Sequence, residues 1–572
     1  MNHRLFVAIR LTSAVVLAGC VAIFSLGILI HPKILDWDSR RGLLSAMQYE
    51  QSLVPNIVQL ASADPHNLLQ THFEPEAWRS PGYQAIPWLF RQFGMSWGHA
   101  VRASILLFFF MGVVAWCACY RLVVKDTWAV VGFALALMLS PIMVDSLKVY
   151  DSGDLLLFGF VPVLILLNIL TLRQRSKLAA HAFAAAGGLL STTIFFFKYS
   201  GIFIGIGVGV AWLLICFFQR EHRRIFISWL IGAVSGIAAI LATGYPWGPT
   251  PTSSIGAGIK WRDGILAFGA WPLSMTDSAE SISRIGTFAG ISEFEMRTVW
   301  CPAMGLVFCG ILVWLLRREM TDTFMAFRGA VKRCSLDAWW PHMLMTIPFL
   351  TDTLSYAAII FCGGSVEVCA RLARLSGLLA FPILFVMVWR YALASTPAVR
   401  VVCMALLALF IASGPFMGTL RVARLAVSIP SAYRSATEQS LGIRIEGVGS
   451  NLREQAEFYQ ELRTHMPSTE TVLFVTAPEH LLEIPRQRHI LVYVMEQYNS
   501  PEQLAALRFS GRPLYGVAML LPQELEKDGR AVALQKAFAD VREWKSVRFR
   551  SDPRWTLWLS PPMKGSTTVS TK

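Results

Sequence analysis

Long apolar runs separated by short charged segments fill the first three quarters of the chain. A helix needs about 20 apolar residues to cross the hydrocarbon core of a bilayer, so a window of that length locates candidate spans. The chain is therefore predicted to be a polytopic α-helical membrane protein with about eleven spans. They are expected at 6–30, 99–122, 127–146, 154–172, 179–197, 200–218, 225–243, 299–316, 342–361, 372–389 and 398–416.

The composition agrees with this pattern. Of the 572 residues, 54% are hydrophobic and 15% are charged, and the mean hydropathy is +0.50. Soluble proteins carry about 25% charged residues, so a soluble globular protein is excluded. The net charge is +14, but Lys and Arg stand in short segments between apolar runs and form no single basic face. Nucleic acid is therefore not expected as a partner.

The positive residues also predict the orientation, because Lys and Arg stay on the cytoplasmic side of a membrane. Alternate connections between the spans are rich in these residues, and all of them fall on the side of the N-terminus. We therefore expect a multi-pass protein of the inner (plasma) membrane, with a cytoplasmic N-terminus and a periplasmic C-terminal domain. The signal is carried by Arg121, Lys125, Arg173, Arg175, Lys177, Arg220, Arg223, Arg224, Arg317, Arg318, Lys332, Arg333, Arg390 and Arg400.

The last part of the chain changes to a mixed helix and strand pattern. Residues 450–465 predict an amphipathic helix, and strands are expected at 471–476, 490–494, 515–521 and 555–559. We predict two domains. Residues 1–416 form a transmembrane domain that includes the outer loops 31–98 and 244–298, and residues 417–572 form a small extracytoplasmic α/β domain.

Two carboxylates directly follow the first span. Asp36 and Asp38 stand within a few residues of the predicted membrane edge, where a carboxylate could act as a general base toward a substrate hydroxyl. The alternative is that both are ordinary interfacial acids beside Arg40 and Arg41. Further along this loop, histidines and acids occur without the spacing of a known metal site, so no metal ligands are predicted.

Two further predicted outer turns concentrate charge between apolar helices. One contains Lys148, Tyr150 and Asp154, and the other contains Lys198 between two long apolar runs. Charge at a membrane boundary is costly unless it is hydrated or paired, so both turns indicate a site. A cation such as Lys198 would suit a lipid-linked phosphate. The alternatives are a solvated turn whose Asp154 caps the next helix and a lysine that reaches to the interface.

The order of these features resembles the GT-C superfamily of bacterial membrane glycosyltransferases, which includes protein O-mannosyltransferases and lipid A aminoarabinose transferases. The resemblance covers about residues 1–220. It consists of the acidic motif after the first span, a Pro-containing aromatic segment before the second span and the two polar turns. The last three are Arg79-Ser80-Pro81-Gly82-Tyr83, Tyr150 to Leu156 and Lys198 to Gly201.

This resemblance implies an outer-face active site that transfers a sugar, with inversion, from a polyprenyl-phosphate-linked donor. The acceptor would be an envelope lipid, glycan or protein. Asp38 is the first choice for the catalytic base and Asp36 the second, although the family commonly has Asp-Glu where Asp38 is followed by Ser39. No cofactor is implied, and a requirement for a divalent cation stays open.

The resemblance also implies roles for residues outside the acidic motif. Asp154 would be a site-forming acid and Lys198 a contact to the lipid phosphate. Further substrate-binding positions are expected at Arg79, Tyr83, Lys148 and Tyr150.

Two other functions compete with the transferase hypothesis. A transporter or flippase of amphipathic lipids would also need many spans, but it should place charged residues near the middle of spans. The residues noted above stand at the predicted outer ends. A noncatalytic membrane scaffold would tolerate loss of Asp36 and Asp38.

Overall fold

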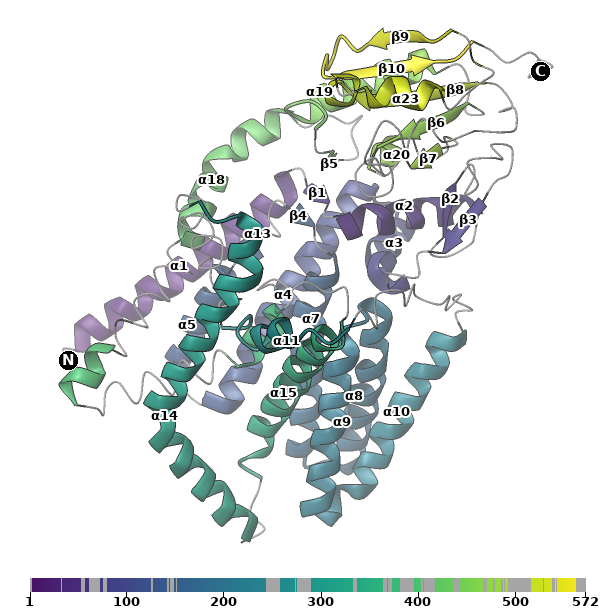
Figure 1. Cartoon of the computed structure of the whole chain (residues 1–572). Coiled ribbons are helices and arrows are strands. Elements are labelled where there is room, and N and C mark those ends of the chain that lie inside the picture. The colour runs from purple at the N-terminus through teal and green to yellow at the C-terminus, as the bar shows by residue number, and fades with distance from the viewer. Residues whose placement is uncertain are drawn as a thin grey trace. The chain divides into compact units, whose positions relative to one another are not determined.

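The computed structural model of the chain separates into two compact units (Figure 1). The spanning unit consists of Met1–Ile30, Ala103–Lys148 and Ser152–Ile429, and the loop–tail unit consists of His31–Arg102, Val149–Asp151 and Pro430–Lys572. Each unit therefore combines segments that are distant in the sequence. The structure describes residues 3–31, 33–35, 37–52, 57–60, 72–75, 80–124, 127–140, 143–144, 149–150, 152–242, 258–272, 274, 290–332, 337–363, 368, 373–380, 396–402, 405, 417–435, 442–445, 447–466, 471–476, 479–484, 487, 489–491, 516–527, 529–536, 541 and 543–561.

Within the described residues, seven helices are long and apolar enough to cross a membrane. Each coincides with a predicted span, which confirms the polytopic helical class. The apolar helices α1 (His3–Ile30) and α5 (Thr127–Met138) match two more, whereas the spans predicted at 372–389 and 398–416 lie mostly outside the described residues. The seven are α4 (Trp97–Val124), α7 (Ser152–Arg173), α8 (Lys177–Phe197), α9 (Gly201–Phe218), α10 (Arg223–Ala242) with its preceding turn η2 (Arg220–His222), α14 (Cys301–Lys332) with its preceding π-turn η4 (Met296–Trp300), and α15 (Trp340–Phe361).

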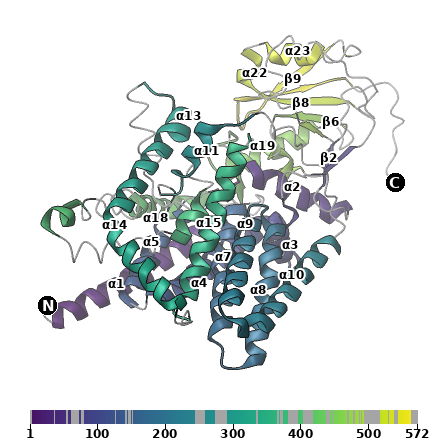
Figure 2. The same cartoon turned by 60° about the horizontal axis from the view of Figure 1, so that its bottom comes forward.

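Small residues bring the spanning helices close together. Helix α8 packs against α7, α9 and α10, and α15 packs against α9 (Figure 2). A Cβ on Gly188 of α8 would lie 1.8 Å from the carbonyl oxygen of Trp229 in α10, so only glycine permits this approach. A buried hydrogen bond of 2.6 Å from Trp212 Nε1 to Asn168 Oδ1 links α9 to α7. Helices α7 and α8 are thus fixed against several neighbours.

Three further helices are described besides the spans and the elements of the loop–tail unit. They are α11 (Trp261–Ala267), α13 (Glu293–Glu295) and α18 (Met417–Ser435). Residues of α11 and α15 share a small apolar cluster that includes Leu266 and Ile360.

The first predicted outer loop folds with the tail. Its residues contact those from Pro430 onward more than they contact the spans, so both belong to the loop–tail unit. The predicted division of the chain between residues 416 and 417 stays a prediction. The loop contains β1 (Lys33–Leu35), α2 (Trp37–Ser52), β2 (Ile57–Leu60), β3 (His72–Pro75), η1 (Pro81–Gln84) and α3 (Ala85–Gln92). Strands β2 and β3 form an antiparallel pair.

A three-stranded parallel sheet joins three distant parts of the sequence. Strand β1 lies in the middle, between β4 (Val149–Tyr150) and β5 (Ile443–Arg444). Leu35 is paired with Tyr150, and Ile34 is paired with Arg444. The strand that precedes the acidic motif is therefore held on both edges by backbone hydrogen bonds.

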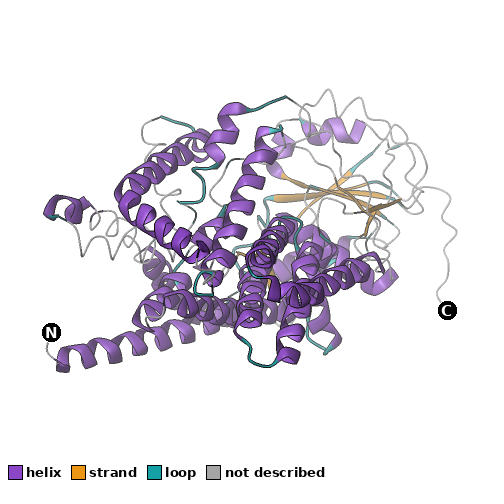
Figure 3. Cartoon of the chain, turned by 90° about the horizontal axis from the view of Figure 1, so that it is seen from below, coloured by secondary structure: helices purple, strands orange, loops and turns teal. Residues whose placement is uncertain are grey.

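The tail forms a five-stranded sheet in the order β7-β6-β8-β10-β9. Strands β7, β6 and β8 are parallel, and β10 and β9 continue the sheet antiparallel. The four strands predicted here are confirmed, and all described strands of the chain belong to the loop–tail unit (Figure 3). The elements are α19 (Leu452–His465), β6 (Val472–Val475), α20 (His480–Glu483), β7 (His489–Leu491), β8 (Val517–Pro522), α22 (Gln523–Lys527), α23 (Arg530–Lys536), β9 (Lys545–Arg548) and β10 (Trp555–Leu559).

The predicted tail helix is α19. It begins at the N-cap residue Asn451, whose side chain accepts hydrogen bonds from the backbone N–H groups of Arg453 and Glu454. Its apolar side, which includes Phe458 and Leu462, is fully buried. An amphipathic helix over a mixed sheet is the α/β architecture that the sequence predicts for this part of the chain.

Candidate active site

Asp154 and Lys198 form an ion pair inside the spanning unit. Asp154 lies in the first turn of α7, where a carboxylate is favoured by the helix dipole. Lys198 is the C-cap residue of α8, where a cation is favoured for the same reason. Lys198 Nζ donates a hydrogen bond to Asp154 Oδ1, and only 18% and 11% of the two side chains are exposed. Two residues that the sequence marked separately are therefore direct partners.

A second carboxylate belongs to the same cluster. Asp352 lies within α15 and is 7% exposed. Its Oδ2 accepts a hydrogen bond of 2.5 Å from Ser376 Oγ, and Thr353 Oγ1 donates to Ser376 Oγ at 3.2 Å. The Lys198 ammonium attracts the Asp352 carboxylate electrostatically. We call Asp154, Lys198, Asp352, Ser376 and Thr353 the charged cluster.

Sequence reasoning missed Asp352. The window that predicts the span at 342–361 does not reveal this acid, because the surrounding Leu, Ile, Phe and Met residues dominate about 20 residues. An acid inside such a span is rare and marks a functional site by default. That single residue was the signal that could have identified the third member of the cluster.

The charged cluster can hold an anion or a polyol next to an apolar surface. A lysine ammonium has three donors, so it can contact a phosphate oxygen while it keeps a carboxylate partner. Carboxylates accept hydrogen bonds from sugar hydroxyl groups. A cation framed by acids is therefore suited to a headgroup that carries both a phosphate and a sugar.

Asp38 of the acidic motif lies at the start of a helix in the loop–tail unit. Asp38 is in the first turn of α2, directly after β1, while its side chain and all of Asp36 fall outside the described residues. Strand β4 pairs with β1 in parallel, so the carboxyl ends of both strands lie at one edge of the sheet. Tyr150 ends β4 and is buried.

The other predicted binding residues are described less fully. Arg79 and Lys148 lie outside the described residues, and the backbone of Tyr83 lies in η1 without a described side chain. Among the side chains that the structure describes, no three His, Cys, Asp or Glu residues gather in a way that could hold a metal ion. The structure therefore adds geometry for Asp154, Lys198 and Tyr150.

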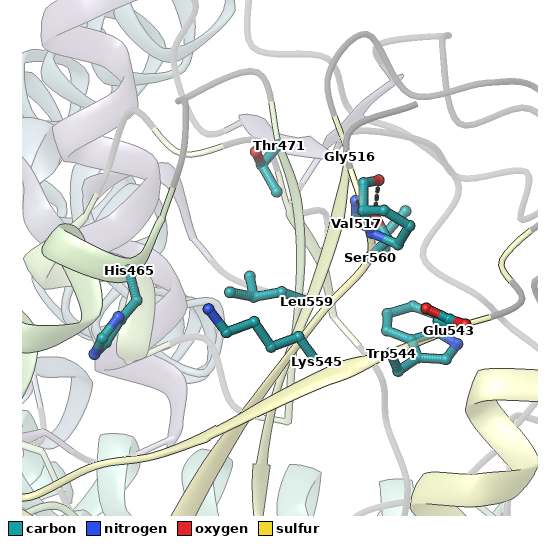
Figure 4. Close-up of a pocket in the computed structure, with 10 residues that line it drawn as sticks. His465, Thr471, Gly516, Val517, Glu543, Trp544, Lys545, Leu559 and Ser560 are labelled. Atoms are coloured by element: carbon teal, nitrogen blue, oxygen red, sulfur yellow. Dashed lines mark hydrogen bonds between the residues drawn. The ribbon is translucent and has the colours of Figure 1, made fainter. Parts of the chain in front are cut away.

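A cavity of about 400 Å³ occurs in the tail (Figure 4). Leu559 and Lys545 lie at its centre, with His465 on one side and Trp544 on the other. It lies at the amino-terminal ends of β6 and β8. Ligand sites of parallel sheets form at the opposite ends, where the strands finish. No residue of the charged cluster and no predicted site residue lines it. The cavity is therefore not the candidate active site.

The chain shares its fold with a membrane protein of known structure. The chain is similar to ArnT from Cupriavidus metallidurans, whose crystal structure was determined bound to undecaprenyl phosphate. The similarity covers 96% of this chain and 97% of ArnT, with 12% sequence identity and a TM-score of 0.50. The apo structure of ArnT gives 13% identity, the same coverage and a TM-score of 0.49.

Comparisons at the level of sequence gave no match. No protein-family model matches the chain, and no curated protein matches it significantly. The likeness to ArnT thus shows the fold alone.

Proposed function

We propose that this protein is a membrane glycosyltransferase that transfers a sugar from a polyprenyl-phosphate-linked donor to an extracytoplasmic acceptor. The observation that carries the proposal is the charged cluster around Lys198, which combines a cation and two carboxylates among apolar helices. Its occurrence in the fold of ArnT, a protein solved with undecaprenyl phosphate bound, supports a lipid phosphate as the ligand.

In this proposal Lys198 contacts the phosphate that leaves. A sugar phosphodiester gains negative charge on its phosphate oxygen as the bond to the anomeric carbon breaks. A cation placed there stabilises the transition state more than the ground state. Asp154 holds the ammonium in position, and Asp352 supplies a second carboxylate that can orient it or accept from a sugar hydroxyl.

Asp38 is the proposed base. Its carboxylate takes the proton of the acceptor hydroxyl while the acceptor oxygen bonds to the anomeric carbon. The bond between that carbon and the phosphate oxygen breaks, and the phosphate keeps the electron pair. A single displacement of this kind inverts the anomeric configuration. Asp36 is the second choice for the base.

Further contacts to the substrates are proposed for Tyr150, Lys148, Arg79 and Tyr83. The proposed orientation has a cytoplasmic N-terminus and a periplasmic tail, since the Lys- and Arg-rich connections fall on the side of the N-terminus. A lipid donor would then arrive through the bilayer, and a polar envelope lipid, glycan or protein would arrive from the periplasm.

The test is incorporation of radiolabelled sugar into envelope material by membranes that contain the protein. A panel of undecaprenyl-phosphate-linked hexoses and pentoses serves as donors. The wild type is compared with Asp38→Asn, Asp36→Asn and the matched control Asp263→Asn, which changes a partly exposed acid of α11 paired with the exposed Arg262. Loss of transfer in Asp38→Asn or Asp36→Asn at equal insertion supports the proposal and identifies the base. Unchanged transfer in both would contradict the mechanism.

One observation favours a second candidate, a transporter of lipid-linked sugars. Asp352 lies within a span and not at its end, which is where a transporter is expected to carry charge. Vesicles with the purified protein and a fluorescent polyprenyl-phosphate sugar separate the two functions. A transporter moves the lipid between leaflets without an acceptor, whereas a transferase releases polyprenyl phosphate only when an acceptor is present.

A further inference from the structure

The side chain of Arg40 links β1 of the first loop to the tail. Arg40 lies two residues after Asp38 in α2. Its Nε donates to the carbonyl oxygen of Leu35, the last residue of β1, at 2.9 Å. Its Nη1 donates to Glu479 Oε1 at 2.6 Å, and the two side chains are only 13% and 6% exposed. One guanidinium thus contacts the strand before Asp38 and the tail.

Glu479 lies beside a buried and hydrogen-bonded part of the tail. It immediately precedes α20, whose first residue, His480, is buried. Tyr459 of α19 shares a hydrogen bond of 2.8 Å with His480 Nδ1, and the Trp555 ring of β10 packs edge-on to the His480 ring with the ring centroids 4.8 Å apart. Burial, with a smaller effect of the Arg40 charge, lowers the pKa of His480 to about 3. The imidazole is therefore neutral and adds no competing cation beside Glu479.

Helix α19 also supports β1, through hydrogen bonds to the segment of its partner strand β5. Gln455 of α19 is fully buried. Its Nε2 donates to the carbonyl oxygen of Ile443 at 2.9 Å, and its Oε1 accepts from the N–H of Ile445 at 2.7 Å. These bonds hold β5, the partner strand of β1. Gln455 Nε2 also donates to Glu483 of α20 at 3.2 Å. Helix α19 therefore supports both β1 and α2.

The position of this contact in the tail is also informative. Glu479 follows β6 at its carboxyl end, which is the edge where α/β sheets place their functional loops. Helix α2, which begins beside Asp38, contacts α20 there.

We propose that Arg40 and Glu479 are positioning residues, through which the tail sets the orientation of the helix that carries Asp38. The C-terminal α/β part is then a component of the active site and not an appended module. This inference rests on the proposed transferase function for its catalytic readout. Arg40 acts through the backbone of β1 and α2 and does not touch the substrate.

The test uses the full-length protein in detergent or nanodiscs. The variants are Glu479→Gln, Arg40→Lys and the control Glu457→Gln, which makes the same change in an exposed ion pair of α19 with Arg453. Hydrogen–deuterium exchange is measured over residues 37–52, and kcat and KM for the lipid-linked donor are measured in the transfer assay. Glu479→Gln is expected to increase exchange in α2 and to lower kcat at least tenfold, with KM changed less than threefold. The control should match the wild type.

A smaller effect is expected for Arg40→Lys, which keeps the charge and loses one of the two hydrogen bonds. If Glu479→Gln fails to fold, the exchange and kcat of Arg40→Lys test the inference in its place. Unchanged exchange in α2, or a kcat within twofold of the wild type in a folded variant, overturns the inference. If the wild type itself transfers no sugar, the proposed function fails, while the exchange measurement still decides whether the tail positions α2.

Discussion

Replacement of Lys198 by Met is the most direct test of the charged cluster. Met keeps the length of the side chain and removes its charge, so Asp154 loses its ion-pair partner and Asp352 loses a nearby positive charge in a poorly hydrated place. Removal of one partner from a buried ion pair costs about 3–5 kcal/mol of folding free energy. The lower value of this range is expected because 18% of the Lys198 side chain and 11% of the Asp154 side chain are exposed to solvent. Loss of the contact to the leaving phosphate should lower kcat by about 100- to 1,000-fold.

The assay separates these two effects. Thermal unfolding of the purified protein reports stability, and sugar transfer by the folded fraction, isolated by size-exclusion chromatography, reports catalysis. Lys177→Met is the matched control, because Lys177 is the exposed first residue of the same helix α8. Lys198→Arg, which keeps the charge, should retain more activity than Lys198→Met. Folded Lys198→Met protein that transfers sugar within threefold of the wild type would refute the phosphate contact.

Three other outcomes are expected. Asp38→Asn should lower kcat by about 100- to 10,000-fold as a lost general base, measured against Asp36→Asn at equal insertion. Folded His480 stays neutral, whereas unfolded His480 gains a proton below about pH 6.5, so the free energy of unfolding should fall by about 2 kcal/mol on going to pH 5. Unfolding of the wild type and His480→Gln at pH 7 and pH 5 tests this. An equal loss of stability in both proteins would contradict it. Gly188→Ala should destabilise the spanning unit by about 1–3 kcal/mol, since its Cβ would meet the Trp229 carbonyl oxygen, and an unchanged unfolding temperature would contradict the close contact.

Sequence reasoning succeeded where the physical signal is local. An apolar run long enough to cross a bilayer is visible without any knowledge of its neighbours, and so are the short apolar runs that predicted β6, β8 and β10. Asp154 and Lys198 stood out because charge next to an apolar helix is costly. Strand β9, with mainly exposed residues such as Lys545 and Arg548, has no alternating apolar pattern and was not predicted.

The features that were missed depend on distant partners. The strands β1, β4 and β5 have only two or three residues each, so no periodicity can reveal them. The partners in the Arg40–Glu479 ion pair are 439 residues apart, and nothing near either residue indicates the other. The pairing of Asp154 with Lys198 likewise follows from the packing of α7 on α8, which the sequence pattern does not specify.

The pairing of β1 with β5 has a consequence for the synthesis of the protein. Lys33 leaves the ribosome roughly 400 residues before its partner Ile443, which at about 5–20 residues per second is a delay on the order of 20–80 s. During this time β1 has no partner on one edge. The first loop therefore cannot reach its final structure until the last quarter of the chain has been made, and a nascent chain or a product of early termination has an incomplete strand junction next to Asp38.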